Sequence, residues 1–253
     1  MTNEAANIAT SNKKEEAIKS ILEFLPKDVE IPVLPPTQNR WYDLVDKSKP
    51  ITIRPLTYED EKVAAKAREG GGDILTILLD RCVSNVNVND LLLFDKLYFL
   101  LKLREATYGT TFESQISCKE CKEESNISFD LSRVIITEVP EDVSDPYTFS
   151  LPVLKKDISI RFPRVRDEVY FSGPEQDLGT NIWRFVAAID GHTDPYIISE
   201  VIKKLHVQDV HRIMLELGGT NWGIDPKVDF TCPTCKAEYE MELPLTENFF
   251  YLS

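Results

Sequence analysis

The segment ISCKECKEESNISFDL, residues 116–131, gives the clearest indication of the fold. It contains a Cys-x-x-Cys pair, Cys118 and Cys121, followed by a run in which apolar and polar residues alternate. A second segment, VDFTCPTCKAEYEMEL, repeats this design around Cys232 and Cys235. Alternation with a period of two is typical of a strand that has one face in the core and one in water. Each segment therefore predicts a β-hairpin with a cysteine pair in its turn.

Four cysteines in two Cys-x-x-Cys turns form the ligand set of a structural zinc site. Zn–S bonds of about 2.3 Å place the sulfurs of a tetrahedral site about 3.7 Å apart, and a tight turn brings two sulfurs to that separation. Protein ligands then fill all four positions and leave none for water or substrate, which indicates a structural ion. We expect one Zn²⁺ per chain, bound by Cys118, Cys121, Cys232 and Cys235.

The two cysteine pairs are far apart in the sequence, with residues 122–231 between them. The entropy of closing a loop grows only with the logarithm of its length. The long gap therefore costs on the order of 1.5 kcal/mol more than an ordinary zinc-ribbon spacing. Zinc binding to small peptides releases roughly 10–16 kcal/mol. We therefore predict a split zinc ribbon that joins two distant parts of the chain.

Three other interpretations of the cysteine pairs stay open. A redox pair begins a helix beside a βαβ unit, whereas these cysteines lie between predicted strands. Each pair could also share a metal with another chain, or hold no metal. The fifth cysteine, Cys82, lies in the helical segment LLDRCVS and is predicted to be a core residue.

The chain contains an internal repeat outside the hairpins. PITIRPLTYEDE aligns with DISIRFPRVRDE, so that Arg54 and Asp60 correspond to Arg161 and Asp167. YGTTFESQISC aligns without a gap with WGIDPKVDFTC. Between these anchors we expect the helices DILTILLDRCV and NDLLLFDKLYFLLKLREATYG in the first half, and PYIISEVIKKL and VQDVHRIMLELGG in the second. The prediction is an internally duplicated α+β fold, each half running strand, helix, helix, strand, knuckle, strand.

The predicted domain organisation follows from this repeat. The polar N-terminus lacks the apolar residues that a folded core needs and is expected to be disordered. A short amphipathic helix and a proline-rich arm precede the first half. The segments are the disordered N-terminus at 1–14, the helix and arm at 15–48, the first half at 49–136, a linker at 137–154 and the second half at 155–253.

The composition excludes several classes of partner. The net charge is −13 and the pI about 4.8, which argues against nucleic acid and against an anionic membrane surface. The longest apolar run, residues 91–103, is interrupted by Asp95, Lys96 and Lys102 and is predicted to be a buried helix rather than a membrane span. The N-terminus has no apolar core typical of a secretory signal, so we expect a cytosolic protein.

Catalytic motifs were sought and none is predicted. His192, His206 and His211 do not have the spacing of helical metal ligands, and no Ser or Cys lies in a nucleophile-elbow context. The three glycines of REGGGD follow no strand and precede no Gly-Lys-Ser/Thr, so a phosphate loop is not expected. The sequence predicts no enzyme.

Four segments together resemble the baseplate hub and hub-assembly proteins of T4-type contractile-tailed bacteriophages. They are the arm IPVLPPTQNRWYD, the strand ITIRPLTYEDEKV, the helix LFDKLYFLLKLREATYG and the knuckle ISCKEC. The resemblance covers residues 30–245, and its most specific part is LREATYGTTFESQISCKEC.

The resemblance implies a non-enzymatic structural or assembly protein that binds other baseplate proteins. It places the protein in the tail baseplate of the virion and, during assembly, in the host cytoplasm. Both permanent virion components and assembly factors share the pattern. The alternative is a zinc-ribbon adaptor in transcription or nucleic-acid processing, against which the acidic balance counts. A thiol oxidoreductase, a third class, predicts a thiol pKa well below 8.5.

Overall fold

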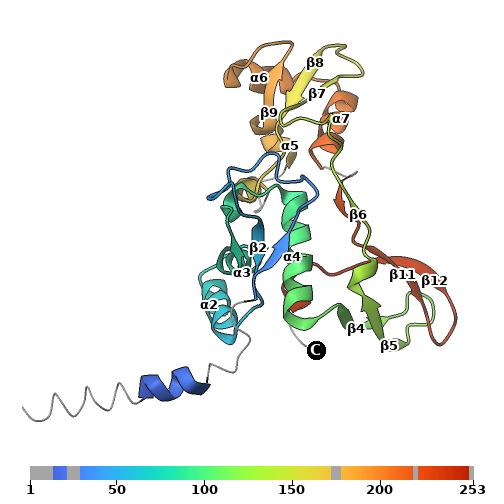
Figure 1. The fold of residues 1–253 in the computed structure, drawn as a ribbon. Coiled ribbons are helices and arrows are strands. Elements are labelled where there is room, and N and C mark those ends of the chain that lie inside the picture. Colours follow the sequence, from blue (N-terminus) through green and yellow to red (C-terminus); the bar gives the residue numbers. More distant parts are fainter. Residues whose placement is uncertain (1–13, 22–28, 172–177, 219–221, 251–253) are drawn as a thin grey trace, which may run out of the picture.

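A computed structural model describes residues 14–21, 29–171, 178–218 and 222–250 of the chain. Helices and strands follow one another along it, and the strands form several small sheets of two or three strands. The predicted α+β class is therefore confirmed. Figure 1 shows two lobes, a larger one that contains both hairpins and a smaller one built from the middle of the second half of the sequence.

The first half begins with a three-stranded antiparallel sheet in the order β1–β2–β3. Thr57 and Asp73 cap the two helices of this region through their side-chain oxygens, as N-cap residues do. The elements are β1 (Ile31–Val33), β2 (Ile51–Ile53), α2 (Tyr58–Glu69), α3 (Ile74–Cys82), β3 (Val83–Ser84) and the 3₁₀ helix η1 (Val88–Asp90).

Helix α4 (Leu93–Tyr108) forms the centre of the larger lobe (Figure 1). Phe99, Leu101 and Leu103 are almost completely buried because the helix packs against α3, against β2 and against a strand from the second half. A helix that is apolar on most of its circumference is buried in this way. No helix within the described ranges is long and apolar enough to cross a bilayer.

The limits of α4 differ in part from the prediction. The helix was expected to begin at Asn89 or Asp90, but these residues form the separate turn η1 and α4 begins at Leu93. Asn87 is the residue whose side chain caps η1. The predicted stop at Gly109 is confirmed, and its φ of 81° explains why glycine ends the helix.

The smaller lobe has its own three-stranded antiparallel sheet, in the order β7–β8–β9. Its helices cover an apolar core that includes Ile160, Phe185 and Ile213, all fully buried. The elements are β7 (Tyr147–Ser150), β8 (Asp157–Ile160), η3 (Val165–Tyr170), α5 (Leu178–Asn181), η4 (Ile182–Phe185), β9 (Val186–Ile189), α6 (Pro195–Ile202) and α7 (Val207–Leu217).

Both predicted hairpins are present, and they lie beside each other at one side of α4 (Figure 1). The first is β4 (Thr111–Ser117) with β5 (Glu124–Asp130), and the second is β11 (Lys227–Thr231) with β12 (Glu238–Glu242). A two-stranded antiparallel pair of β6 (Ile136–Thr137) and β10 (Gly223–Ile224) links them at their base. The short 3₁₀ turns η2 (Leu131–Arg133) and η5 (Glu247–Phe250) complete the lobe.

The two halves share a contact between strand and turn. In the first half, the guanidinium of Arg54 donates to both carboxylate oxygens of Asp60, at 2.7 and 3.0 Å. In the second half, Arg161 donates to both oxygens of Asp167 at the same two distances. The sequence repeat aligns Arg54 with Arg161 and Asp60 with Asp167. The aligned letters therefore mark equivalent contacts.

Helices α4 and α7 also contain matching buried aspartates at their third positions, Asp95 and Asp209. Asp95 accepts hydrogen bonds from the hydroxyls of Thr37 and Tyr42, each at 2.5 Å. Asp209 accepts the two backbone N–H groups of residues 153–154, at 2.7 and 3.0 Å. In each three-stranded sheet, the segment that follows the first strand is therefore held by the third residue of a helix, although both segments lie outside the predicted halves, in the arm and in the linker.

The order of the helices differs from the predicted one. PYIISEVIKKL was expected to take the place of DILTILLDRCV, but α3 precedes the third strand of its sheet whereas α6 follows the third strand of its own. The turn after β8 is the 3₁₀ helix η3, where the first half has the α-helix α2. Asp194 and Pro195 explain the position of α6, because a cap followed by proline starts a helix after β9.

The proline-rich arm, residues 34–46, lies across the junction of the two lobes. The ring of Trp41 stacks on that of Phe162 at 5.6 Å. The guanidinium of Arg40 donates to the carbonyls of residues 139–140, at 2.7 and 3.0 Å. The helix predicted before the arm is present at residues 14–21, and its side chains are exposed.

The cores do not follow the halves of the sequence. Ile224, Leu243 and Phe249 come from the second half but belong to the larger core, together with residues of α4. The hairpins and the C-terminal turn of the second half thus pack on the first. Of the predicted N-terminal segments, residues 1–13 and 22–28 lie outside the described residues.

Candidate metal centre

The structure brings the four predicted ligands together. The Sγ atoms of Cys118, Cys121, Cys232 and Cys235 all lie within 4.8 Å of one another. Across the hairpins, Cys118 Sγ is 3.7 Å from Cys235 Sγ, and Cys121 Sγ is 3.8 Å from Cys232 Sγ. These two distances match the edge of about 3.7 Å that a tetrahedron of Zn–S bonds requires. The residues therefore fit a single four-coordinate zinc ion.

Both cysteine turns have the same backbone geometry. In the first, the N–H of Cys118 donates to the carbonyl of Glu123 at 2.9 Å, and the N–H of Lys122 donates back to Cys118 at 3.1 Å. In the second, Cys232 and Ala237 make the first of these bonds at 2.9 Å, and Lys236 makes the second at 3.0 Å. Such a turn aims the backbone N–H groups at the sulfurs.

A residue with positive φ closes each cysteine turn. Lys122 has a φ of 61° and Lys236 a φ of 62°. A lysine in the left-handed region costs about 1 kcal/mol relative to its preferred conformations. The same unfavourable conformation in both turns indicates that the surrounding contacts fix the geometry of the cysteines.

A small apolar cluster supports the sulfurs. Cys118 and Cys232 are buried in it with Phe230, and the ring of Phe230 lies 4.8 Å from that of Tyr239. The phenol of Tyr239 accepts the backbone N–H of Lys119 from the other hairpin, at 3.3 Å. Cys121 and Cys235 are exposed. This cluster and the bond from Lys119 to Tyr239 join the cysteine ends of the two hairpins.

The electrostatics of the cluster call for a cation. The backbone N–H of Cys121 donates to the sulfur of Cys118 and lowers the pKa of that thiol to about 6. The N–H of Cys235 lowers the pKa of Cys232 in the same way. For Cys121, the N–H of Glu123 lowers the pKa, but burial and the neighbouring sulfurs outweigh it and raise the pKa to about 12. Four cysteine sulfurs this close together form the ligand set that Zn²⁺ prefers, and bound Zn²⁺ would keep all four deprotonated.

The remaining cysteine and the histidines lie elsewhere. Cys82 is buried in α3, as predicted for a core residue, and burial raises the pKa of its thiol to about 12. His206 caps α7 through Nδ1, which accepts the N–H of Gln208. His211 is exposed on the same helix. None of these residues joins the sulfur cluster.

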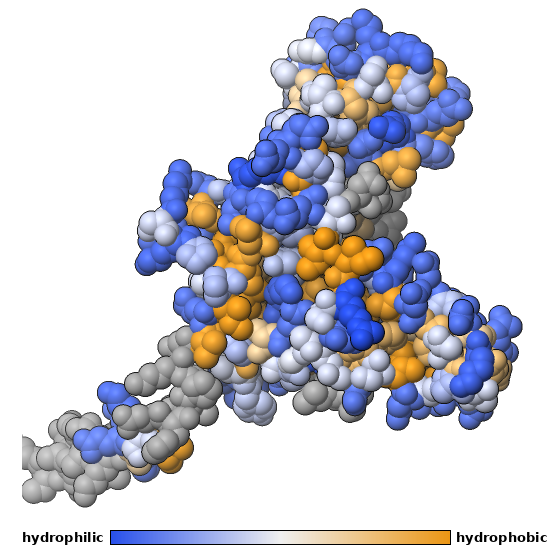
Figure 2. Space-filling view, turned by 45° about the vertical axis from the view of Figure 1, so that its right-hand side comes forward, coloured by the Kyte–Doolittle hydropathy of each residue, from blue (hydrophilic) through white to orange (hydrophobic). Residues whose placement is uncertain are grey.

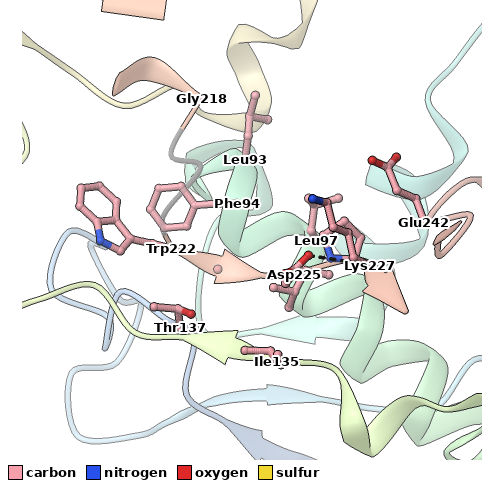
Figure 3. Close-up of a pocket in the computed structure, with 13 residues that line it drawn as sticks. Leu93, Phe94, Leu97, Ile135, Thr137, Gly218, Trp222, Asp225, Lys227 and Glu242 are labelled. Atoms are coloured by element: carbon pink, nitrogen blue, oxygen red, sulfur yellow. Dashed lines mark hydrogen bonds between the residues drawn. The ribbon is translucent and has the colours of Figure 1, made fainter. Parts of the chain in front are cut away.

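A pocket of about 520 Å³ lies between α4 and the β6–β10 pair. Figure 3 shows Phe94 and Trp222 at one end, and Asp225, Lys227 and Glu242 at the other. Figure 2 shows apolar surface gathered in this middle part of the molecule, below the smaller lobe. The lining contains no His, Ser or Cys, and its charged residues are Asp225, Lys227 and Glu242.

Gly223 at the edge of this pocket is required by close packing. Its φ is 91°, and a Cβ atom there would lie 3.1 Å from Cβ of Phe94. It aligns with Gly109, which also has a positive φ. The aromatic-Gly pairs of the sequence repeat are therefore equivalent turns that lead into equivalent hairpins.

Sequence reasoning missed a buried charge network at the junction of the lobes. Lys96 is buried in α4 and its ammonium group donates to Asp73 at 2.8 Å and to Glu168 at 2.7 Å. Its neighbour Asp95 holds the arm through Tyr42. The signal was present, because two adjacent charges in an otherwise apolar helix need partners. Their partners come from distant segments and only the fold identifies them.

Comparison with protein families gives a match over most of the chain. The sequence fits the model of a family described as T4 bacteriophage base plate protein over residues 36–250, a span that contains both cysteine pairs. No curated protein and no solved structure matches.

Proposed function

Because the chain belongs to the T4 bacteriophage base plate protein family, we propose that it is a non-enzymatic structural or assembly protein of the baseplate hub. A member of this family is a structural protein of the phage tail baseplate and interacts with other baseplate proteins. We propose further that this protein acts at the hub of the baseplate, and that it acts by protein binding alone. The observation that carries it is the family match over most of the chain.

The proposal includes one structural Zn²⁺ bound by Cys118, Cys121, Cys232 and Cys235. Two observations support it: the distances between the sulfurs and the equal geometry of the two turns. The ion closes the second hairpin onto the first. Its task is to fix the shape of the larger lobe for binding.

Internal duplication is also part of the proposal. The matching Arg–Asp pairs, the matching aspartates of α4 and α7, and the matching cysteine turns support it. The halves are residues 49–136 and 155–253, joined by a linker at 137–154. The differing helix order then reflects divergence of the segments between the shared anchors.

We further propose that the partners are proteins and that neither nucleic acid nor membrane is bound. The net charge of −13 supports this, since contact with phosphates requires clustered basic residues. Assembly would take place in the host cytoplasm before the protein enters the tail. Salt-dependent DNA binding would instead favour the zinc-ribbon adaptor.

Affinity purification from phage-infected cells tests the function. The full chain is tagged and expressed during infection, and the proteins that co-purify are identified by mass spectrometry, with an unrelated tagged acidic protein as control. We expect baseplate hub proteins to be enriched. Their absence from the eluate, together with absence of the chain from purified tails and virions, contradicts the proposal. Presence in the eluate but not in virions identifies an assembly factor.

A further inference from the structure

A groove of about 460 Å³ lies between the two hairpins. We call it the ribbon groove. One wall consists of four consecutive residues of β5, Ile127, Ser128, Phe129 and Asp130, and the other of all five residues of β11. Neither β4 nor β12 contributes to its lining.

The walls of the ribbon groove are strand edges. Successive side chains on a strand point to opposite faces, so a sheet face would contribute every second residue. Consecutive residues line a groove only where the strand presents its edge. Among the described strands, β5 pairs only with β4, and β11 only with β12. Each wall therefore has backbone N–H and C=O groups without a neighbouring strand.

The two edges are held at a fixed separation. At one end of the hairpins lies the sulfur cluster. At the other, β6 pairs with β10 and the N–H of Asp225 donates to the carbonyl of Ile135 at 2.8 Å. Since β5 runs away from the cysteines and β11 runs toward them, the edges are antiparallel. An added strand would therefore run parallel to one of the two edge strands and antiparallel to the other.

The side chains along both walls alternate. Ile127 and Phe129 on β5, and Val228 and Phe230 on β11, are the more buried residues of each strand. The residues between them are polar and exposed. A segment that adds to these edges therefore meets apolar side chains at every second position on one face, and water on the other.

One charge in the groove lacks a partner. Asp130 pairs with Arg133 at 3.8 Å, and Lys227 pairs with Glu240 at 3.9 Å. Asp229 lies directly opposite Glu240 in the hairpin, and no ion pair to it exists within the described part of the chain. Like charges opposite one another are unfavourable, and a cation from outside relieves them.

We propose that the ribbon groove binds an extended segment of another baseplate protein by β-strand addition. The segment is about five residues long, has apolar side chains at alternate positions and places a Lys or Arg beside Asp229. A free strand edge favours an extended segment, because such a segment offers backbone N–H and C=O groups to the edge and a helix does not. The inference deepens the proposed function and rests on it.

The test uses a library of random twelve-residue peptides screened against the purified full chain. We expect the selected peptides to share apolar residues at positions i, i+2 and i+4 with a basic residue between them. In hydrogen exchange, a selected peptide is expected to protect amides of β5 and β11 and to leave those of β4 and β12 unchanged. Failure to select any peptide, helical spacing of i, i+3 and i+4, or protection elsewhere contradicts the proposal.

A matched pair of variants locates the basic residue. Asp229→Lys is expected to weaken binding of the selected peptide by about tenfold or more, whereas Glu113→Lys on β4, an exposed residue that does not line the groove, changes it by less than about threefold. Equal loss in both variants contradicts the placement. Failure of these tests leaves co-purification with baseplate proteins intact, and loss of co-purification alone overturns the proposed function.

Discussion

Asp95 and Asp209 occupy the same position in α4 and α7, yet their surroundings differ. Oδ2 of Asp95 accepts hydrogen bonds from two hydroxyl groups, and its Oδ1 has no partner among the described residues. Burial raises the pKa of Asp95 to about 6. Asp209 receives a backbone N–H on each oxygen. Hydroxyls can turn either to donate or to accept, whereas two backbone N–H groups only donate and need an acceptor on each oxygen.

The comparison teaches which features of the two halves are interchangeable. The cysteine turns and the Arg–Asp pairs agree to within a few tenths of an ångström, because tight backbone turns and bidentate geometry allow little variation. The segments between them differ in helix order and in hydrogen-bond chemistry. Matched substitutions in the two halves therefore separate the shared framework from the parts that diverged.

The largest effect is expected from substituting one of the four cysteines of the proposed zinc site. Cys232→Ser is expected to lower the zinc content from one to below about 0.1 per chain, because a site with three cysteine ligands binds Zn²⁺ much more weakly than a site with four. Both hairpins then lose protection in hydrogen exchange, including β4–β5, which keeps its own two cysteines. Cys82→Ala is the control and retains zinc. A variant that keeps its metal and a protected first hairpin contradicts a shared site.

The Arg–Asp pairs come next. Asp60 is fully buried and also accepts a hydrogen bond from Arg81 at 2.6 Å, whereas Asp167 pairs with Arg161 and with no second cation within the described residues. Asp60→Asn is expected to reduce the free energy of unfolding by about 3 kcal/mol and Asp167→Asn by about 1–2 kcal/mol. Urea denaturation of the two variants measures the difference.

The pH dependence of these two sites has a definite sign. Arg54 and Arg161 hold the pKa values of Asp60 and Asp167 below the usual range even though burial alone would raise them. Their contribution to stability is complete above the unfolded pKa of about 4 and is lost as the pH falls toward the folded values. Equal acid sensitivity of wild type and Asp60→Asn contradicts this assignment.

The two helix aspartates are expected to respond with opposite signs. Asp209→Asn puts an NH₂ group against a backbone N–H and is expected to cost about 1–3 kcal/mol. Asp95→Asn keeps an acceptor for Thr37 and Tyr42 and removes a buried charge. At pH 7.5 it is therefore expected to be neutral or stabilising by up to about 2 kcal/mol. Urea denaturation at two pH values measures both.

The pH dependence of stability provides the control for the Asp95→Asn variant. Its folded pKa of about 6 lies above the unfolded value, so its contribution is present below about pH 4 and is lost as the pH rises through 6. The advantage of Asp95→Asn over wild type should therefore grow from pH 4.5 to pH 7.5. A difference that does not change with pH contradicts the buried, weakly solvated carboxyl.

The smallest effect concerns the two turn lysines. Lys122→Gly and Lys236→Gly relieve the left-handed conformation of a non-glycine residue. Each is expected to stabilise its hairpin by no more than about 1 kcal/mol. Thermal unfolding of the two variants checks this, and the halves are expected to respond equally. Destabilisation of one and not the other breaks the equivalence of the turns.

Spacing and alternation in the sequence predicted both hairpins and the approach of the four cysteines. The repeat aligned Arg54 and Asp60 with Arg161 and Asp167, but it did not predict that these residues pair. These features depend on residues close together, or on a repeat that can be aligned. The same ungapped alignment, extended backward, would also have paired Asp95 with Asp209.

The helix order, the buried partners of Lys96 and the place of the arm could not be derived in this way. They depend on which distant surfaces meet. The strand β9, for example, is set by its pairing with β8 rather than by its short sequence VAAI. The partners Asp73 and Glu168 come from different halves and carry no mark that distinguishes them from other acidic residues.

Native mass spectrometry of the full chain tests the central claim most directly, because it counts metal ions in the monomer. We predict a monomer with one zinc ion, held by the two hairpins of the same chain. A monomer without zinc, a monomer with two ions, or zinc found only in dimers would contradict the split site that joins the halves.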